Sequence, residues 1–248
     1  MLRDVRFLNM GACLIDQSQL VTGHPVGDVV RIPIWAYLLR GDDGLLLVDT
    51  GMPRGCIGNE LYFGEMESGD LITPQMQAGD MVDRVLARQD VRPQDIDGVI
   101  FTHAHFDHAG GSGLFQGTRI LIHPDELQAL RQDPEPPEWI DLGLRYETVQ
   151  DGAEPMPGVR LIHTPGHTPG HMSLLLRPRG VRPLLLTIDA VYTRRNWEDD
   201  ILGAMTDRVQ GQASVDRLRA VAAAEDAAVF FGHDRDQAKE TFWQAFAR

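Results

Sequence analysis

Histidine and aspartate side chains crowd one short stretch of the chain. Residues 102–111 read THAHFDHAGG, so three of the nine histidines in 248 residues fall within six positions, beside an aspartate. Neutral imidazole and carboxylate are ligands that borderline divalent metals prefer. His103 and His105 are spaced to reach one ion, whereas Asp107 and His108 lie past a turn and are placed for another. The stretch therefore predicts half of a two-metal site.

Three further candidate ligands lie far along the chain. His167 stands in HTPGHTPGH, Asp189 ends the apolar run LLLTID, and His233 follows VFFG. Each follows an apolar run or a Pro-Gly turn, so we expect all three to reach one rim of the fold. A carboxylate after a buried run is costly unless it is paired or binds metal. Asp189 is therefore expected to bridge the two ions.

Short apolar runs predict the strands that position these residues. Strands are expected over 32–39, 45–51, 97–102, 119–123, 159–164, 172–177, 183–190 and 227–234. Helices are expected over 81–89, after Ser214 as N-cap, and over 236–247. Because strands alternate with helices in two similar halves, we predict an α/β fold, an αββα sandwich, with 1–248 as a single domain.

Residues 52–80 are rich in glycine and show no sustained period. A loop of this length is commonly functional. Leu61, Phe63 and Met66 make it too apolar for a solvated linker. We expect it to fold over the site, to form a subunit contact, or to pack on its own core, and the apolar side chains of 61–72 leave a homodimer open.

Charge and composition narrow the classes of partner. A formal net charge of −13 disfavours binding to nucleic acid or to anionic lipid. No apolar run has the length of a membrane span, and the N-terminus lacks the pattern of a signal peptide. The two cysteines, Cys13 and Cys56, have no metal-type spacing. A reducing cytoplasm is the expected setting.

The motif H-x-H-x-D-H at 103–108, with its distant His, Asp and His, resembles that of the metallo-β-lactamase superfamily. The resemblance implies that one ion is held by His103, His105 and His167, and a second by Asp107, His108 and His233, with Asp189 bridging them. Ligation by nitrogen and oxygen without thiolate favours Zn²⁺, with Mn, Fe and Co as alternatives.

Within that superfamily, the stretches 45–53, 105–111, 184–200 and 229–234 are similar to the N-acyl-homoserine lactonases. The resemblance implies hydrolysis of the homoserine lactone ring by a metal-bridging hydroxide, which opens N-acyl-homoserine lactones and quenches quorum signals. It also implies roles for Asp107 in proton transfer and for Tyr192 as hydrogen-bond donor to the oxyanion. Candidate contacts to the substrate are Tyr192, Phe106, Leu61, Phe63 and Met66.

Other activities on the same ligand set remain alternatives. A glyoxalase II-like thioester hydrolase shares all seven ligands, but the C-terminal region offers only the scattered basic residues Arg235, Lys239 and Arg248. A β-lactamase commonly carries another ligand at the position of Asp189. The net charge disfavours an RNA-processing nuclease. A flavodiiron-type redox module needs a flavin domain, so a hydrolase is the favoured class.

Overall fold

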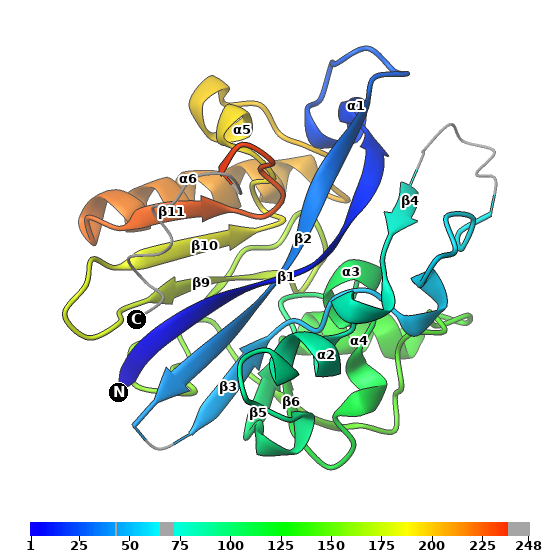
Figure 1. Cartoon of the computed structure of the whole chain (residues 1–248). Coiled ribbons are helices and arrows are strands. Elements are labelled where there is room, and N and C mark those ends of the chain that lie inside the picture. Colours follow the sequence, from blue (N-terminus) through cyan, green and yellow to red (C-terminus); the bar gives the residue numbers. More distant parts are fainter. Residues whose placement is uncertain (43, 65–71, 238–248) are drawn as a thin grey trace.

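The computed structural model describes residues 1–42, 44–64 and 72–237. Within these residues, the strands form one sheet in the order β4-β1-β2-β3-β5-β6-β7 and a second in the order β11-β10-β9-β8 (Figure 1). The larger sheet contains β1 (Leu2–Asp16), β2 (Val29–Gly41), β3 (Leu45–Val48), β4 (Ile72–Gln75), β5 (Gly98–Ile100), β6 (Arg119–Ile122) and β7 (Arg145–Thr148). The smaller sheet contains β8 (Val159–His163), β9 (Met172–Leu176), β10 (Leu184–Ile188) and β11 (Ala228–Phe231).

The described part of the chain forms six α-helices. They are α1 (Gln17–Leu20), α2 (Val82–Ala87), α3 (Phe106–Ala109), α4 (Pro124–Gln132), α5 (Arg194–Asp199) and α6 (Arg208–Ala224). Short 3-10 turns span Arg54–Cys56, Ala78–Asp80, Pro93–Asp95 and Ser112–Leu114. In Figure 1, α6 runs along the smaller sheet, whereas α2 and α4 lie on the side of the larger one. No helix in the described part of the chain is long and apolar enough to cross a membrane.

The four layers follow from the alternation of side chains along buried strands. In β2, Leu38 packs in the core that includes residues of α2 and α4, while its neighbour Leu39 packs between the two sheets. In β9, Leu174 joins the core between the sheets, and Leu175 packs in the core that includes residues of α6. Both faces of these strands are thus apolar, and the predicted αββα sandwich is confirmed.

A strand is found within each predicted apolar run, but several of them end earlier than predicted, among them 45–51 at Val48, 183–190 at Ile188 and 227–234 at Phe231. The run 32–39 lies in β2, which pairs antiparallel with β3. The long strand β1 was not predictable in the same way, because charged residues interrupt its apolar pattern. It pairs with β2 from Leu2 opposite Gly41 to Asp16 opposite Val29. Pairing along its whole length, rather than local propensity, makes this segment a strand.

The start predicted for the last long helix is wrong. α6 begins at Arg208, where the Asp207 side chain caps it by accepting hydrogen bonds from the N–H groups of Val209 and Gln210. Ser214 lies inside the helix, and its Oγ donates to the carbonyl of Pro165 at 2.6 Å. Both residue types are good N-caps, and only the packed structure shows which one is used.

The segment 52–80 is partly regular. Its residues Ile72–Gln75 form β4, an edge strand that pairs antiparallel with β1. Met66 lies outside the described residues, as does the predicted closing helix from residue 238 onward. The single domain, the homodimer contact and the cytoplasmic setting stay predictions.

Parallel strands gather the chemistry at one edge. β3, β5 and β6 run parallel in the larger sheet, as do β10 and β11 in the smaller one. Within two residues of the ends of these strands come Asp49, Thr102, His123, Asp189 and His233. Because the carboxyl ends of parallel strands meet at one edge of a sheet, residues distant in sequence are brought together there.

Candidate metal centre

The structure brings all seven candidate ligands together as two adjoining groups. The first group is His103, His105, His167 and Asp189, and the second is Asp107, His108 and His233. Within each group the ligand atoms lie within 4.8 Å of one another. The loop after β5 supplies two of these residues, α3 two, the β8–β9 loop one, and the ends of β10 and β11 one each.

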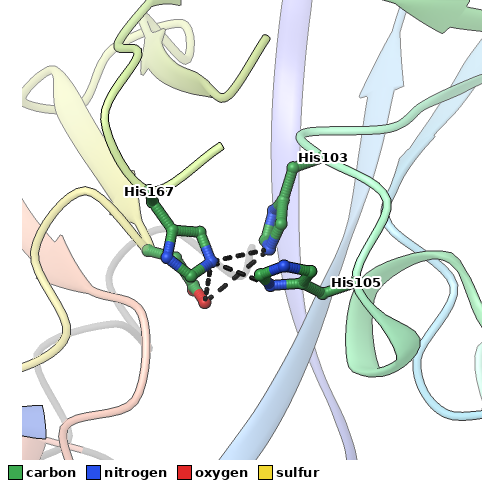
Figure 2. Close-up of side chains that lie close together, drawn as sticks. His103, His105 and His167 are labelled. Carbon is green, nitrogen blue, oxygen red and sulfur yellow. Dashed lines mark hydrogen bonds and ion pairs between the residues drawn. The ribbon is translucent and has the colours of Figure 1, made fainter. Parts of the chain in front are cut away.

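Three imidazoles converge in the first group (Figure 2). His167 Nε2 lies 3.2 Å from His103 Nε2 and 2.9 Å from His105 Nδ1. Burial lowers the pKa of His103 well below its usual range and that of His167 to about 3, so both rings are neutral at pH 7. One proton can serve only one of these nitrogen–nitrogen contacts. A cation between the rings would use all three lone pairs, so the group fits a metal ion.

Asp189 faces both groups. Its Oδ2 lies 3.4 Å from His167 Nε2 and 3.8 Å from His103 Nε2. Its Oδ1 lies 3.2 Å from His233 Nε2 and 3.4 Å from His108 Nε2. The backbone N–H of Asp189 donates to His171 Nε2 at 3.1 Å, which fixes the turn after β10. One carboxylate is thus placed between two sets of imidazoles, the geometry that a bridging ligand needs.

The second group is oriented by partners outside it. The His108 Nδ1–H donates to Asp49 Oδ2 at 2.8 Å, and the His233 Nδ1–H donates to the Pro33 carbonyl at 2.9 Å. Each Nε2 therefore points inward, to 3.5 Å and 3.6 Å from Asp107 Oδ2. Such outer partners fix the tautomer of metal-binding histidines.

Unsatisfied atoms beside this second group also fit a cation. His108 Nε2 and Asp189 Oδ1 are buried, and neither has a hydrogen-bond partner among the described residues. Burial lowers the pKa of His108, but the carboxylates of Asp107, Asp189 and Asp49 raise it well above its usual range. The negative charge that holds a proton here is the same charge that would hold a metal ion.

Asp49 is a buried residue beside the site that the sequence patterns did not single out. It is fully buried, it accepts hydrogen bonds from the backbone N–H and the hydroxyl of Thr102, and it orients His108. Its signal in the sequence is a carboxylate directly after the apolar run LLLV, the same pattern that indicates Asp189. Asp49 thus links the end of β3 to the second group of ligands.

A third group of ligand-type residues lies outside this centre. His123, Asp125 and His163 have donor atoms within 4.8 Å of one another. The two rings, however, are stacked 3.7 Å apart at an interplanar angle of 11°. An imidazole binds a metal in the plane of its ring, so two stacked rings do not direct lone pairs at one ion. The pair is instead a packing contact between the N-cap of α4 and the last residue of β8.

A cavity of about 190 Å³ opens onto the centre. Its lining combines polar residues of both ligand groups with apolar walls: Cys13, Ile15, Gln19, Leu20, Ile32, Ile72, His105, Phe106, Asp107, His167, Asp189, Tyr192, Ala204 and His233. The Tyr192 hydroxyl lies 2.9 Å from His167 Nδ1 and 3.2 Å from the Ala204 carbonyl. Burial raises the pKa of Tyr192 well above its usual value, so the phenol keeps its proton. A hydrogen-bond donor therefore stands beside the first group of ligands.

Two candidate substrate contacts lie beyond this lining. Phe63 packs edge-on against Phe106, with ring centroids 4.5 Å apart, and Trp139 adds a third ring. Leu61 is 71% exposed and lines a different hollow, beside β4. Phe106 thus connects the cavity to an aromatic wall, and the contribution of Phe63 and Leu61 to substrate binding stays a prediction.

Comparison with known proteins decides the family. A model of the metallo-beta-lactamase superfamily matches residues 29–233, a span that contains all seven candidate ligands. The chain belongs to this superfamily. The four-layer architecture and the two groups of ligands are those of a metallo-beta-lactamase fold with a site that fits two metal ions.

Similar proteins within the superfamily include lactonases. An N-acyl homoserine lactonase of Bacillus sp. is 40% identical over 93% of this chain and 93% of its own length. A solved structure of an N-acyl homoserine lactone hydrolase, with the product N-hexanoyl-L-homoserine at its catalytic metal center, superposes with a TM-score of 0.92. It is 37% identical, with 96% of each chain covered. A B. thuringiensis AiiA variant with N-decanoyl-L-homoserine at its active site also gives 0.92, at 36% identity and 96% coverage of each chain. This metallo-beta-lactamase chain thus belongs to the N-acyl homoserine lactonase family.

Proposed function

We propose that this chain hydrolyses the ester bond in the lactone ring of N-acyl-homoserine lactones and releases N-acyl-homoserines. The observation that carries the proposal is the meeting of all seven ligand-type side chains and Tyr192 at one cavity, in a chain 40% identical to an N-acyl homoserine lactonase. Opening the ring would destroy a quorum signal, so quorum quenching is the proposed role.

We propose two divalent metal ions as cofactors, with Zn²⁺ as the first choice because the donors are imidazole nitrogen and carboxylate oxygen. His103, His105 and His167 would hold one ion, Asp107, His108 and His233 the other, and Asp189 both. Such ions, when bound, lower the pKa of water toward 7 and polarise a carbonyl.

Two side chains of the cavity would handle charge and protons. Tyr192 would donate its hydroxyl hydrogen to the lactone carbonyl oxygen as negative charge develops there. Burial raises the pKa of Asp107, but His108 and His233 more than offset this, so its pKa lies below the usual value. Asp107 is thus a carboxylate that would accept the proton of the attacking water and deliver it to the departing ring oxygen.

The acyl tail would leave the cavity along its apolar side. Phe106 lines the cavity and carries Phe63 on its outer face. A saturated chain on this aromatic wall would gain binding energy in proportion to the apolar area that it covers. Residues away from the reacting ring would then set the preference for chain length.

Proton release from short- and long-chain N-acyl-homoserine lactones tests the proposal. We expect turnover that chelation abolishes and zinc restores. A glutathione thioester and a chromogenic β-lactam, run on the same metal-loaded preparation, are the comparison substrates. Thioester cleavage without lactone turnover would overturn the substrate assignment and leave the metal site standing.

A further inference from the structure

Glu126 is a buried carboxylate that belongs to neither group of candidate ligands. It lies in the first turn of α4 and is 4% exposed. Its Oε1 accepts a hydrogen bond from the backbone N–H of Ala104 at 2.9 Å. Its Oε2 accepts one from the Thr168 hydroxyl at 2.7 Å and one from the backbone N–H of Gly170 at 3.0 Å. Three donors thus satisfy a group whose burial would otherwise be costly.

These three donors lie on the two loops that carry the first group of imidazoles. Ala104 stands between His103 and His105, in the loop after β5 of the larger sheet. Thr168 directly follows His167, in the loop that joins β8 to β9 of the smaller sheet. One carboxylate therefore ties together loops from different sheets, immediately behind the point where their histidines meet.

Close packing holds the β8–β9 loop on α4. A Cβ at Gly170 would lie 2.3 Å from the backbone nitrogen of Glu126 and 2.4 Å from its Cβ, so only glycine fits there. A second contact anchors the same loop: the His163 Nε2–H donates to the Pro169 carbonyl at 3.0 Å, and the ring stacks on His123. These contacts hold the β8–β9 loop in one position on α4, and the Glu126 carboxylate is the charged group among them.

We propose that Glu126 is a positioning residue that holds the two histidine loops in register for the first metal ion. The proposal rests on the proposed two-metal site, and it does not depend on which substrate the enzyme takes. The reason is geometric. The 3.2 Å and 2.9 Å separations between His167 Nε2 and the ring nitrogens of His103 and His105 bridge the two loops, and Glu126 sets the spacing of those loops. Without this link, metal binding would have to order the loops itself, and affinity would fall.

The variant Glu126→Gln tests this link with little change in size. In either orientation of the new amide, its NH₂ group faces a backbone N–H, that of Ala104 or that of Gly170, which cannot accept a hydrogen bond. Thr168→Val removes a single hydrogen bond and keeps the shape of the side chain. Glu135→Gln is the matched control, because it removes the same charge at an exposed position just beyond α4.

Zinc affinity, measured by competition with a chromophoric chelator on metal-stripped protein, is the readout. In a His233→Ala background the second group lacks a ligand, so the retained ion reports on the first. There we expect Glu126→Gln to weaken zinc binding by about 10–100-fold, the range typical of outer partners of metal ligands. Thr168→Val should weaken zinc binding by less than Glu126→Gln does, and Glu135→Gln should leave it unchanged. In a His167→Ala background, where the remaining ion sits in the second group, Glu126→Gln should leave its affinity unchanged.

Thermal unfolding of the metal-free protein separates positioning from general packing. Zinc raises the melting temperature by an amount that can be measured in each variant. If Glu126 positions the loops, Glu126→Gln reduces this zinc-induced rise by more than it lowers the melting temperature of the metal-free protein. Unchanged zinc affinity in the His233→Ala background would overturn the proposal. An equal loss in both backgrounds, matched by a loss of metal-free stability, would also overturn it. If Glu126→Gln does not fold, Thr168→Val decides by the same criteria. Zinc alone is the probe, so a failed lactonase assay leaves this result readable.

Discussion

Asp189 places its two carboxylate oxygens on different sets of histidines: Oδ2 lies 3.4 Å from His167 Nε2, and Oδ1 lies 3.2 Å from His233 Nε2. The two imidazoles come from the β8–β9 loop and from the segment after β11, and they are 66 residues apart in the sequence. One side chain thus couples both halves of the proposed metal centre, and a change there is expected to affect both ions.

The variant Asp189→Asn removes the shared negative charge while keeping the shape of the side chain. We expect both ions to be lost more readily than in any variant of a residue that contacts only one group, because each ion loses a charged ligand. Zinc per chain after dialysis measures the effect. Asp199→Asn, an exposed carboxylate on α5, serves as the control and should keep both ions. Two tightly held ions in Asp189→Asn would contradict the bridging role.

Tyr192→Phe removes the hydroxyl that stands beside His167. We expect kcat for a short-chain lactone to fall by about 10²–10³-fold, the loss typical of removing one oxyanion donor, with a small change in KM. Zinc content should stay the same, because the phenol is not among the candidate ligands. Tyr146→Phe, on β7, removes a hydroxyl that donates to the Asp141 carbonyl and does not line the cavity, so it should have no effect. An unchanged kcat in Tyr192→Phe would exclude the donor role.

Phe63→Ala removes the outer ring of the aromatic wall on Phe106. We expect KM to rise for long-chain substrates such as the decanoyl lactone and to change little for the butanoyl lactone, because only a long tail would reach this ring. Initial rates across a series of chain lengths give the comparison within one protein. An equal rise for every chain length would show that Phe63 supports the cavity rather than the tail.

Acidification should release the two ions in sequence. In the metal-free protein, burial lowers the pKa of His167 to about 3, whereas the carboxylates around His108 raise its pKa well above 6.5 despite burial. Near neutral pH a metal ion must therefore displace a proton from the second group, and it meets neutral rings in the first. Zinc affinity of the second group should fall more steeply as the pH decreases from 8 to 5.5.

Competition titrations at each pH, in the His233→Ala and His167→Ala backgrounds, assign the losses. The ion retained in the His167→Ala background should show the steeper dependence on pH. Equal slopes in both backgrounds would contradict the assignment of the protonated histidine to the second group.

Much of this protein could be predicted from local patterns in its sequence. The histidine and aspartate cluster from His103 to His108 lies within one short segment. A run of apolar residues precedes this cluster, and similar runs precede Asp189 and His233. Such patterns are readable because the identity of a ligand and the burial of a run are properties of neighbouring residues. They were sufficient for the fold class and for the list of candidate ligands.

Other features depend on contacts between residues far apart in the chain. Asp49 and His108 are separated by 59 residues in the sequence, and Glu126 and Thr168 by 42, so no local pattern pairs them. β1 is a strand because β2 pairs with it. The N-cap of α6 is Asp207 rather than Ser214, whose hydroxyl donates to the distant Pro165 carbonyl instead.

The sequence by itself therefore determined which side chains are available for chemistry and which segments are buried, because residue type and periodicity are properties of neighbouring residues. Only the tertiary structure decided the distances within the two groups of candidate ligands, which oxygen of Asp189 faces each group, and which buried carboxylates hold the ligands in place. Those relations are distances between loops of different sheets, and the packing of the two sheets against each other sets them.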